Sequence, residues 1–221
     1  MISAEKPERS ELAEISTAAL EGVDSFILTH ETSCGKSPIE STTFLAKAIA
    51  EAEGIYDYEQ AFANVKDEVK TKSRASAIDL LVSTGLSVAF DEGKNLDMFV
   101  CLTETGKTAR YIAKFRPKQP ILACSTNGQT VRQVNMNRGV VGYKIPEHMA
   151  NKTDELIDLI LQVAQEQYIT DLPTSKVMIF TGINEGNPKK EDVTFKLIGG
   201  EEKLDDEEEG EEEVEENEDI E

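Results

Sequence analysis

The chain has 221 residues, 39% hydrophobic and 30% charged, with a formal net charge of −20, which is enough for one or two domains with a buried core. Residues 201–221 hold fifteen Asp or Glu and one Lys, a charge of −14, so the first two hundred residues carry only −6. This balance disfavours nucleic acid and anionic membranes as partners, because both select for basic faces.

The cysteines and histidines do not predict a metal site or disulfides. Cys34, Cys101 and Cys124 lie far apart without metal-ligand spacing, so we expect reduced thiols in a cytosolic protein. His30 and His148 are too few to form a metal site, and we expect no metal or other cofactor. No apolar run reaches about eighteen residues, so we expect no membrane-spanning segment and a cytoplasmic location, free or attached to a large assembly such as the cytoskeleton.

The first 55 residues predict a unit with a single strand. We expect a helix, a strand, a loop and a second helix at residues 8–21, 24–29, 30–37 and 38–52, with Gly22 ending the first helix and Pro38 opening the second. A lone parallel strand cannot pair its own backbone. We therefore interpret residues 1–55 as one slice of a larger sheet or barrel.

Residues 56–200 predict an α/β domain. The pattern is helical to about residue 93 and then alternates, with strands expected at 97–102, 120–124, 139–144 and 176–181 and helices at 105–115, 127–135 and 150–167. This order predicts a doubly wound, mostly parallel five-stranded sheet, closed by an antiparallel edge strand at 193–198. Residues 201–221 should form a disordered acidic tail.

The turn after the first strand of this domain contains Thr103, Thr105, Gly106, Lys107 and Thr108. Hydroxyls, a glycine and a lysine at a helix N-terminus can bind a phosphate, but the same residue types are ordinary helix caps. Both interpretations remain open. A nucleotide P-loop is excluded, because the glycine that this motif needs five residues before Gly106 is Cys101.

Two segments carry a family resemblance. KPERSELAEISTAALEGVDSFILTHETSCGKSPIES resembles the end of the barrel domain of pyruvate kinases, whose motifs run close to P-T-R-A-E, D-G-A-D, S-G-E-T-A-x-G and P-V-E. LTETGKTARYIAKFRPKQPILACSTNGQTVRQVNMNRGV is similar to that family's C-terminal domain, with T-E-S-G-x-S, A-x-Y-R-P, P-I, Q-T-A-R-Q and R-G at the same spacing. The resemblance implies a partial (β/α)8 barrel remnant at 1–55, a C-terminal-like α/β domain at 56–200 and a tail at 201–221.

The resemblance also bears on catalysis. The family transfers a phosphoryl group between phosphoenolpyruvate and ADP, and its lysine, two metal carboxylates and other site residues come from strands that precede this segment. Here Thr29 matches the family's proton-relay serine and keeps a hydroxyl, and His30 replaces a glycine. Glu31 keeps the family's glutamate, for which we expect a role in packing and hydrogen bonding. We therefore expect no catalytic residues beyond this remnant and no activity from the chain alone. Mg and K would be needed only with a catalytic partner chain.

In regulated members, the loop that matches Thr103, Thr105, Gly106, Lys107 and Thr108 holds one phosphate of a sugar bisphosphate. The family's effector-binding tryptophan and arginine have no match, and residues 182–190 replace its glycine-rich effector loop. The resemblance thus leaves a single phosphate as the ligand. The family's last strand lies at a subunit interface, which implies an interface here at Val193, Phe195 and Leu197.

Three functions follow from these expectations. The first is a non-catalytic relative that acts as an interaction or structural subunit, in homo- or hetero-oligomers with pyruvate-kinase-like chains. The alternative is the C-terminal piece of a pyruvate kinase completed by another chain, and a weaker alternative is a phosphate-metabolite-binding regulatory module. The tail is either a solubilising device or a docking segment for a basic protein surface.

Overall fold

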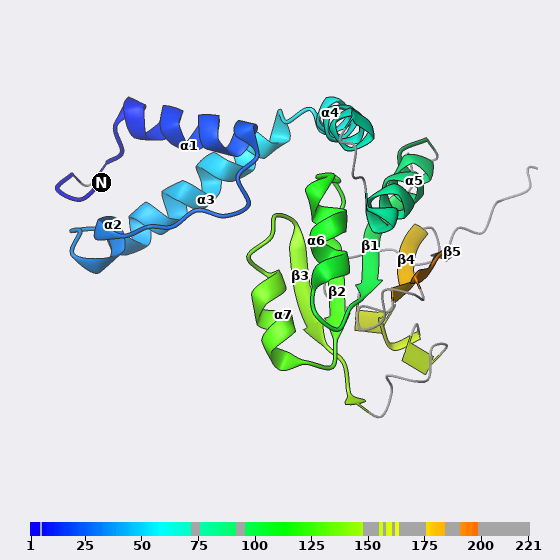
Figure 1. Ribbon diagram of the computed structural model, residues 1–221. Helices are drawn as coiled ribbons and strands as arrows, with labels where there is room; N and C mark the ends of the chain where they lie inside the picture. The colour runs from blue at the N-terminus through cyan, green and yellow to red at the C-terminus, as the bar shows by residue number, and fades with distance from the viewer. Residues whose placement is uncertain are drawn as a thin grey trace, which may run out of the picture.

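The computed structural model describes residues 1–4, 6–71, 76–91, 96–147, 155–156, 158–160, 162–163, 176–183 and 191–198. Figure 1 shows a helical arm, made by the first three helices, beside an α/β domain. The elements are α1 (Arg9–Glu21), α2 (His30–Ser33), α3 (Pro38–Gly54), α4 (Tyr58–Thr71), α5 (Ala77–Asp91), β1 (Leu96–Leu102), α6 (Lys107–Lys114), β2 (Ile121–Ser125), α7 (Gly128–Val134), β3 (Val140–Lys144), β4 (Lys176–Ile183) and β5 (Glu191–Ile198). Within these described ranges, no helix is long and apolar enough to cross a membrane.

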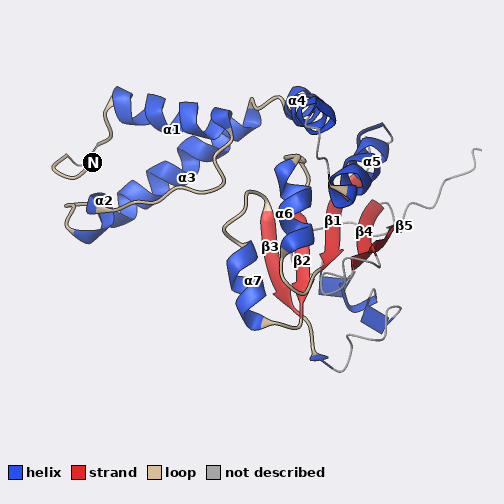
Figure 2. Ribbon diagram, in the orientation of Figure 1, coloured by secondary structure: helices blue, strands red, loops and turns tan. Residues whose placement is uncertain are grey.

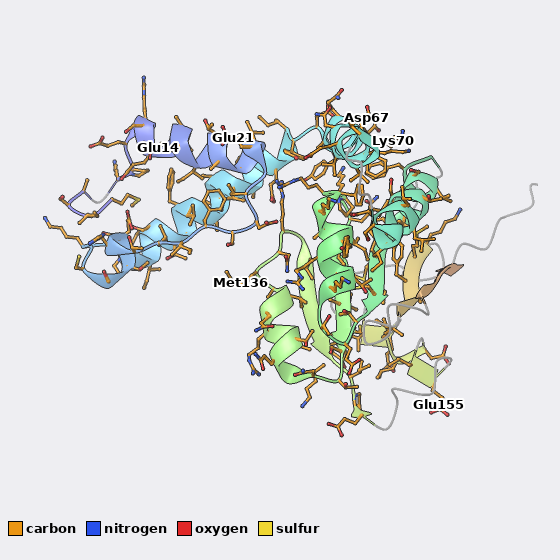
Figure 3. All side chains as sticks on the ribbon, in the orientation of Figure 1. Glu14, Glu21, Asp67, Lys70, Met136 and Glu155 are labelled. Carbon is orange, nitrogen blue, oxygen red and sulfur yellow. The ribbon has the colours of Figure 1, made fainter. Side chains whose placement is uncertain are left out.

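The arm consists of α1 and α3 packed against each other, with the short α2 at one end (Figure 1). α1 ends at Gly22, whose φ of 81° is in the left-handed region that favours glycine and whose N–H donates to the carbonyls of Ala18 and Ala19. α3 begins at Pro38, where a missing N–H costs no hydrogen bond. Both helices of the arm thus begin and end close to where the sequence predicts. Glu14 and Glu21 point from α1 into solvent (Figure 3).

The connection between α1 and α3 differs from the prediction. Residues 24–29 run without strand pairing, so the strand predicted there is wrong, and residues 30–33 form α2 instead of a loop. A strand exists only when a neighbour accepts and donates its backbone hydrogen bonds, and the described part of the chain provides no such neighbour. The structure therefore does not confirm a barrel remnant in residues 1–55.

The sheet confirms the predicted α/β fold. Its strand order is β3-β2-β1-β4-β5, with β1 parallel to both β2 and β4, and β2 parallel to β3. β5 is antiparallel to β4 and lies at the edge of the sheet, as predicted (Figure 2). β1 is the central strand and has helices packed over it.

Both faces of the sheet are buried, and the two faces use alternate residues of each strand. Phe99 and Cys101 of β1 belong to a core with α4, α5, α6 and α7, whereas Met98 and Val100 pack with Leu156 and other apolar residues on the opposite face. A strand covered on both faces needs a continuous apolar run. The expected helix at 150–167 is described only in part, and the predicted tail lies outside the described residues.

Arg138 joins the arm to the α/β domain. Its Nη1 donates to the carbonyl oxygen of Ala19 at 3.2 Å, and its backbone N–H donates to Asp24 Oδ1 at 3.3 Å. Its Nη2 lies 3.2 Å from Glu53 Oε1, and the two groups form an ion pair but not a hydrogen bond. The guanidinium also stacks 4.5 Å from the centroid of the Tyr56 ring. One side chain therefore contacts α1, α3 and the connection to α4.

We predict that Arg138→Gln loosens the arm without unfolding the sheet. The substitution removes a charge-assisted contact and a cation–π contact, each worth on the order of 1–3 kcal/mol. Limited proteolysis should cut residues 22–25 and 55–57 faster in the variant. Arg132→Gln, the same change at an exposed position of α7, is the matched control, and equal cleavage rates in the two variants would contradict the assigned role.

Candidate functional site

The predicted phosphate loop lies at the carboxyl end of β1, where the chain turns into α6. The Thr103 N–H donates to the carbonyl oxygen of Cys124 at 3.0 Å, which ties the start of the loop to β2. The Thr103 hydroxyl accepts a 2.9 Å hydrogen bond from the Gly106 N–H. From α7, the Thr130 hydroxyl donates to the carbonyl oxygen of Glu104 at 2.8 Å. The loop is thus held from two sides by neighbouring elements.

Gly106 is required by this geometry for two reasons. Its φ of 80° is in the left-handed region, where a side chain is strained. A Cβ at this position would also lie 2.7 Å from Val134 Cγ1 of α7. The glycine that the sequence placed at the helix start therefore allows α6 and α7 to approach each other.

The five predicted loop residues fall into two groups. Thr103 and Thr108 are buried, at 7% and 0% exposure. The Thr103 hydroxyl satisfies a backbone N–H inside the loop, while Gly106, the N-cap residue of α6, has no side chain to cap the helix. Thr105 and Lys107 are exposed. A phosphate arriving from solvent would therefore meet the Thr105 hydroxyl, the Lys107 ammonium and the positive end of the α6 dipole. Anion binding at this loop stays a prediction.

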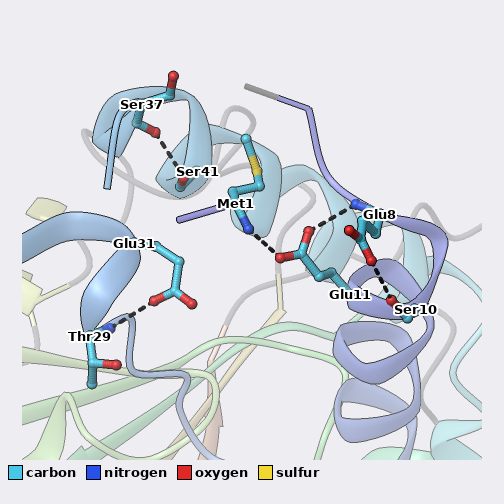
Figure 4. Close-up of polar contacts among 8 residues, drawn as sticks. All are labelled: Met1, Glu8, Ser10, Glu11, Thr29, Glu31, Ser37 and Ser41. Carbon is cyan, nitrogen blue, oxygen red and sulfur yellow. Dashed lines mark hydrogen bonds and ion pairs between the residues drawn. The ribbon is translucent and has the colours of Figure 1, made fainter. Parts of the chain in front are cut away.

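The remnant of the family's catalytic corner lies at the far end of the arm. Glu31 Oε2 accepts a 3.2 Å hydrogen bond from the Thr29 N–H (Figure 4), and the Thr29 hydroxyl lies 3.4 Å from His30 Nδ1. Hydrogen bonds from the backbone N–H groups of Glu31 and Thr29 lower the pKa of the Glu31 carboxyl below its usual value. The carboxylate thus accepts the backbone N–H of Thr29, the N-cap residue of α2, as the glutamate of a capping box does.

The described residues offer no ligand set for a catalytic metal. Within them no three His, Cys, Asp or Glu side chains are grouped as metal ligands would be. Of the cysteines, Cys34 is exposed while Cys101 and Cys124 are buried in strands, and burial raises the pKa of the Cys124 thiol to about 12.

An open apolar groove lies between α1 and α3. It has a volume of about 340 Å³ and is bordered by the unpaired segment before α2. Its apolar lining consists of Met1, Ile15, Ala18, Phe26, Ile27, Leu28, Phe44 and Leu45. The sequence did not predict this groove directly. Its only indication was the predicted strand at 24–29, for which the sequence offered no pairing partner.

The interface predicted at Val193, Phe195 and Leu197 lies on β5, whose backbone forms the outer edge of the sheet. One side of β5 is paired with β4, with Phe195 opposite Phe180. The other side faces no strand among those described.

Arg138, which connects the arm to the domain, was not predicted from the sequence. The only sequence feature that pointed to it was the Arg-Gly pair before β3.

Together these features define a five-stranded, mostly parallel α/β domain that carries a helical arm and a Thr-Gly loop at the start of α6. Residues 84–194 match the family description "Pyruvate kinase, alpha/beta domain". The chain belongs to the pyruvate kinase family. This confirms the resemblance found in the two sequence segments.

Curated relatives and solved structures agree with this assignment. A pyruvate kinase of Eimeria tenella is 35% identical over 81% of this chain and 33% of its own length. One from Dictyostelium discoideum is 31% identical over 91% of the chain and 39% of its length. A crystal structure of a Cryptosporidium parvum pyruvate kinase superposes with a TM-score of 0.76 at 23% identity, over 90% of this chain and 37% of that one. The chain thus spans about a third of these relatives.

We predict that Gly106→Ala destabilises the α/β domain by about 1–3 kcal/mol, because it adds left-handed strain and a clash with Val134. The midpoint of urea unfolding, followed by circular dichroism, measures the loss. Gly54→Ala, at a glycine in α3 whose Cβ would meet no atom within 4 Å, is the control. A variant as stable as this control would show that the loop can relax.

Proposed function

We propose that this chain acts as an interaction or structural subunit in an assembly of pyruvate-kinase-like chains and does not by itself catalyse phosphoryl transfer. The observation that carries the proposal is the arm. Its segment 23–29 has no strand pairing, and it borders an apolar groove. Unpaired backbone next to apolar surface is what a partner chain covers in β-strand addition.

The arm and its connection to α4 expose several large apolar side chains. Ile27, Ile39 and Ile55 are 79%, 76% and 76% exposed, and Leu12 and Leu20 are each more than 40% exposed. Of these residues, Ile27 also lines the groove between α1 and α3, and exposed apolar side chains beside a groove are suited to contact with a partner. Burial of a single isoleucine side chain contributes about 1.5–3 kcal/mol, so a few of these residues could stabilise a complex.

The absence of catalysis by the chain itself is inferred from the described site residues. Phosphoryl transfer needs metal ions and cationic groups that stabilise the developing charge. Thr29 and Glu31 are the only residues that the family resemblance assigns to the catalytic corner, and the Glu31 carboxylate is hydrogen-bonded to the Thr29 N–H. The activity named for the relatives belongs to proteins of which this chain matches about a third of the length.

A second function is favoured by the same groove. Residues 23–29 would complete a barrel if a neighbouring chain supplied strands beside them. In that assembly the other chain would provide the residues for converting phosphoenolpyruvate and ADP, together with Mg and K. A third, weaker function is a regulatory module that binds a phosphate metabolite at Thr105 and Lys107, the exposed members of the loop.

The first test is an activity assay of the purified chain. We expect no conversion of phosphoenolpyruvate and ADP to pyruvate and ATP, with Mg and K present, in an assay coupled to lactate dehydrogenase. The reason is that the described residues hold no group of metal ligands and that the resemblance assigns only Thr29 and Glu31 to the catalytic corner. Activity that copurifies with the protein and is lost in Glu31→Ala would overturn the proposal, whereas activity unaffected by that change and removed by further purification would indicate a contaminant.

Copurification separates the first function from the second. Both predict a stoichiometric partner in the native source, but only the second predicts activity in the recovered complex. A partner with pyruvate kinase sequence and an active complex would favour the completed enzyme. A stoichiometric complex that lacks activity would favour the structural subunit.

We predict self-association through the outer edge of β5, because an unpaired edge invites strand addition. Consecutive N–H groups of a strand point to opposite sides, so proline at Phe195 and proline at Lys196 remove donors from different edges. We expect Phe195→Pro to abolish the complex and leave the monomer folded. Sedimentation at about tens of micromolar, the range of transient affinities, measures this.

Lys196→Pro is the matched variant for the edge. If the Phe195 N–H points toward β4 instead, then Lys196→Pro is the variant that should abolish the complex and Phe195→Pro the one that should disturb the sheet. Circular dichroism of the two variants shows which one disturbs the sheet. A chain that is monomeric at these concentrations, or that associates equally well with either proline, would contradict an interface at this edge.

A further inference from the structure

The charge of this molecule is unevenly distributed over its fold. Residues 96–147, which form β1, α6, β2, α7 and β3, contain eight Lys or Arg against three Asp or Glu, a charge of +5. Residues 1–54, which include the arm, contain four against ten, a charge of −6. The acidic Glu14 and Glu21 project from α1 in the arm, whereas α6 lies in the α/β domain on the other side of the contact between the two parts (Figure 3). This part of the domain is therefore basic in an acidic protein, although two of its cations, Arg116 and Arg138, lie against the arm.

The basic face is centred on α6. Lys107, Arg110 and Lys114 follow each other at spacings of three and four residues, which places them on one side of the helix, and all three are exposed. They line a shallow hollow of about 380 Å³ together with Tyr111, whose ring centroid lies 6.0 Å from Lys107 Nζ. On the same side of the sheet, α7 adds the exposed Arg132.

Few acidic groups neutralise this face. Asp79 of α5 pairs with Lys114 at 2.7 Å, and Glu104 lies exposed in the loop before α6. Lys118 follows α6, and Lys144 approaches Gly128 at the start of α7. The described cations thus outnumber the described carboxylates beside them. A polyanionic segment would therefore be attracted electrostatically to the face of α6 and α7 and not to the acidic arm.

We propose that the acidic segment 201–221 docks on this basic face of its own chain. The segment carries −14, and its charge is complementary to α6 and α7 but repelled by the arm. Because the segment is covalently attached, its effective concentration at the face is of millimolar order, provided that the connection can span the distance. Docking there would also cover Thr105 and Lys107, so the segment and a phosphate would compete for the loop.

The connection is long enough. β5 ends at Ile198, opposite Val177 at the start of β4, and α5 contacts both β5 and α6. Neighbouring strands lie about 4.8 Å apart and packed helices about 8–10 Å apart. With these spacings, α6 lies roughly 15–20 Å from the end of β5. A flexible chain spans about 5–6 Å times the square root of its length, so roughly ten residues suffice, and 23 follow Ile198.

Paramagnetic broadening in the full chain tests the proposal. A spin label on Asn217→Cys in a Cys34→Ser background marks the acidic segment, and the buried Cys101 and Cys124 should not react. We expect the amide signals of α6 and of Arg132 to be broadened several-fold more than those of α1 and α3. The difference should fall strongly between about 0.05 M and 0.5 M NaCl, as the Debye length shortens.

Two variants with equal charge change separate specific docking from general attraction. Lys107→Gln with Arg110→Gln should abolish the broadening at α6, whereas Lys36→Gln with Lys47→Gln, at exposed positions of the arm, should leave it unchanged. Changing the glutamates at 207–209 and 211–213 to Gln should also abolish it. No excess broadening at α6, or an equal loss in both double variants, would overturn the proposal.

A mixed sample distinguishes docking within one chain from docking between copies. Isotope-labelled protein without a spin label is combined with spin-labelled protein that has no isotope label. We expect no broadening of α6 in this mixture at concentrations where the doubly labelled chain shows it. Equal broadening in the mixture would assign the contact to a second copy and overturn docking within the chain.

Discussion

The burial of β1 on both faces is the constraint from which the rest of the domain follows. Its neighbouring residues point to opposite cores, one formed with α4 to α7 and one formed with the residues around Leu156. No water reaches a strand in this position, so its backbone must pair on both edges with β2 and β4. The helices must then lie on the two faces, which is the doubly wound arrangement.

The loop after β1 inherits its shape from this arrangement. It must turn from the centre of the sheet into α6 while α7 packs close beside it, and Gly106 meets both demands. The hydrogen bond from the Gly106 N–H to the Thr103 hydroxyl and that from the Thr130 hydroxyl to Glu104 then fix the loop. The positive end of the α6 dipole and Lys107 face solvent as a result, and the same face carries the cations that we relate to the acidic segment.

The arm and the domain divide the molecule into two kinds of surface. The arm is acidic and has an uncovered apolar groove with an unpaired backbone segment, whereas the face of α6 and α7 is basic and well packed beneath. Arg138 connects the two parts through a few polar contacts around α1 and α3. We relate the first surface to the proposed contact with a partner chain and the second to the proposed docking of segment 201–221.

The sequence by itself determined the sheet, because the apolar run 98–102 has the length and composition of a doubly buried strand, and the positions of β5, α1 and α3 followed from turn and cap residues. It also identified the loop residues and the family. Only the tertiary structure decided that residues 24–29 are not a strand, since strand formation depends on a neighbour that local sequence does not encode. Likewise the roles of Thr103, Thr108 and Arg138 depended on contacts with residues distant in sequence, which periodicity cannot reveal.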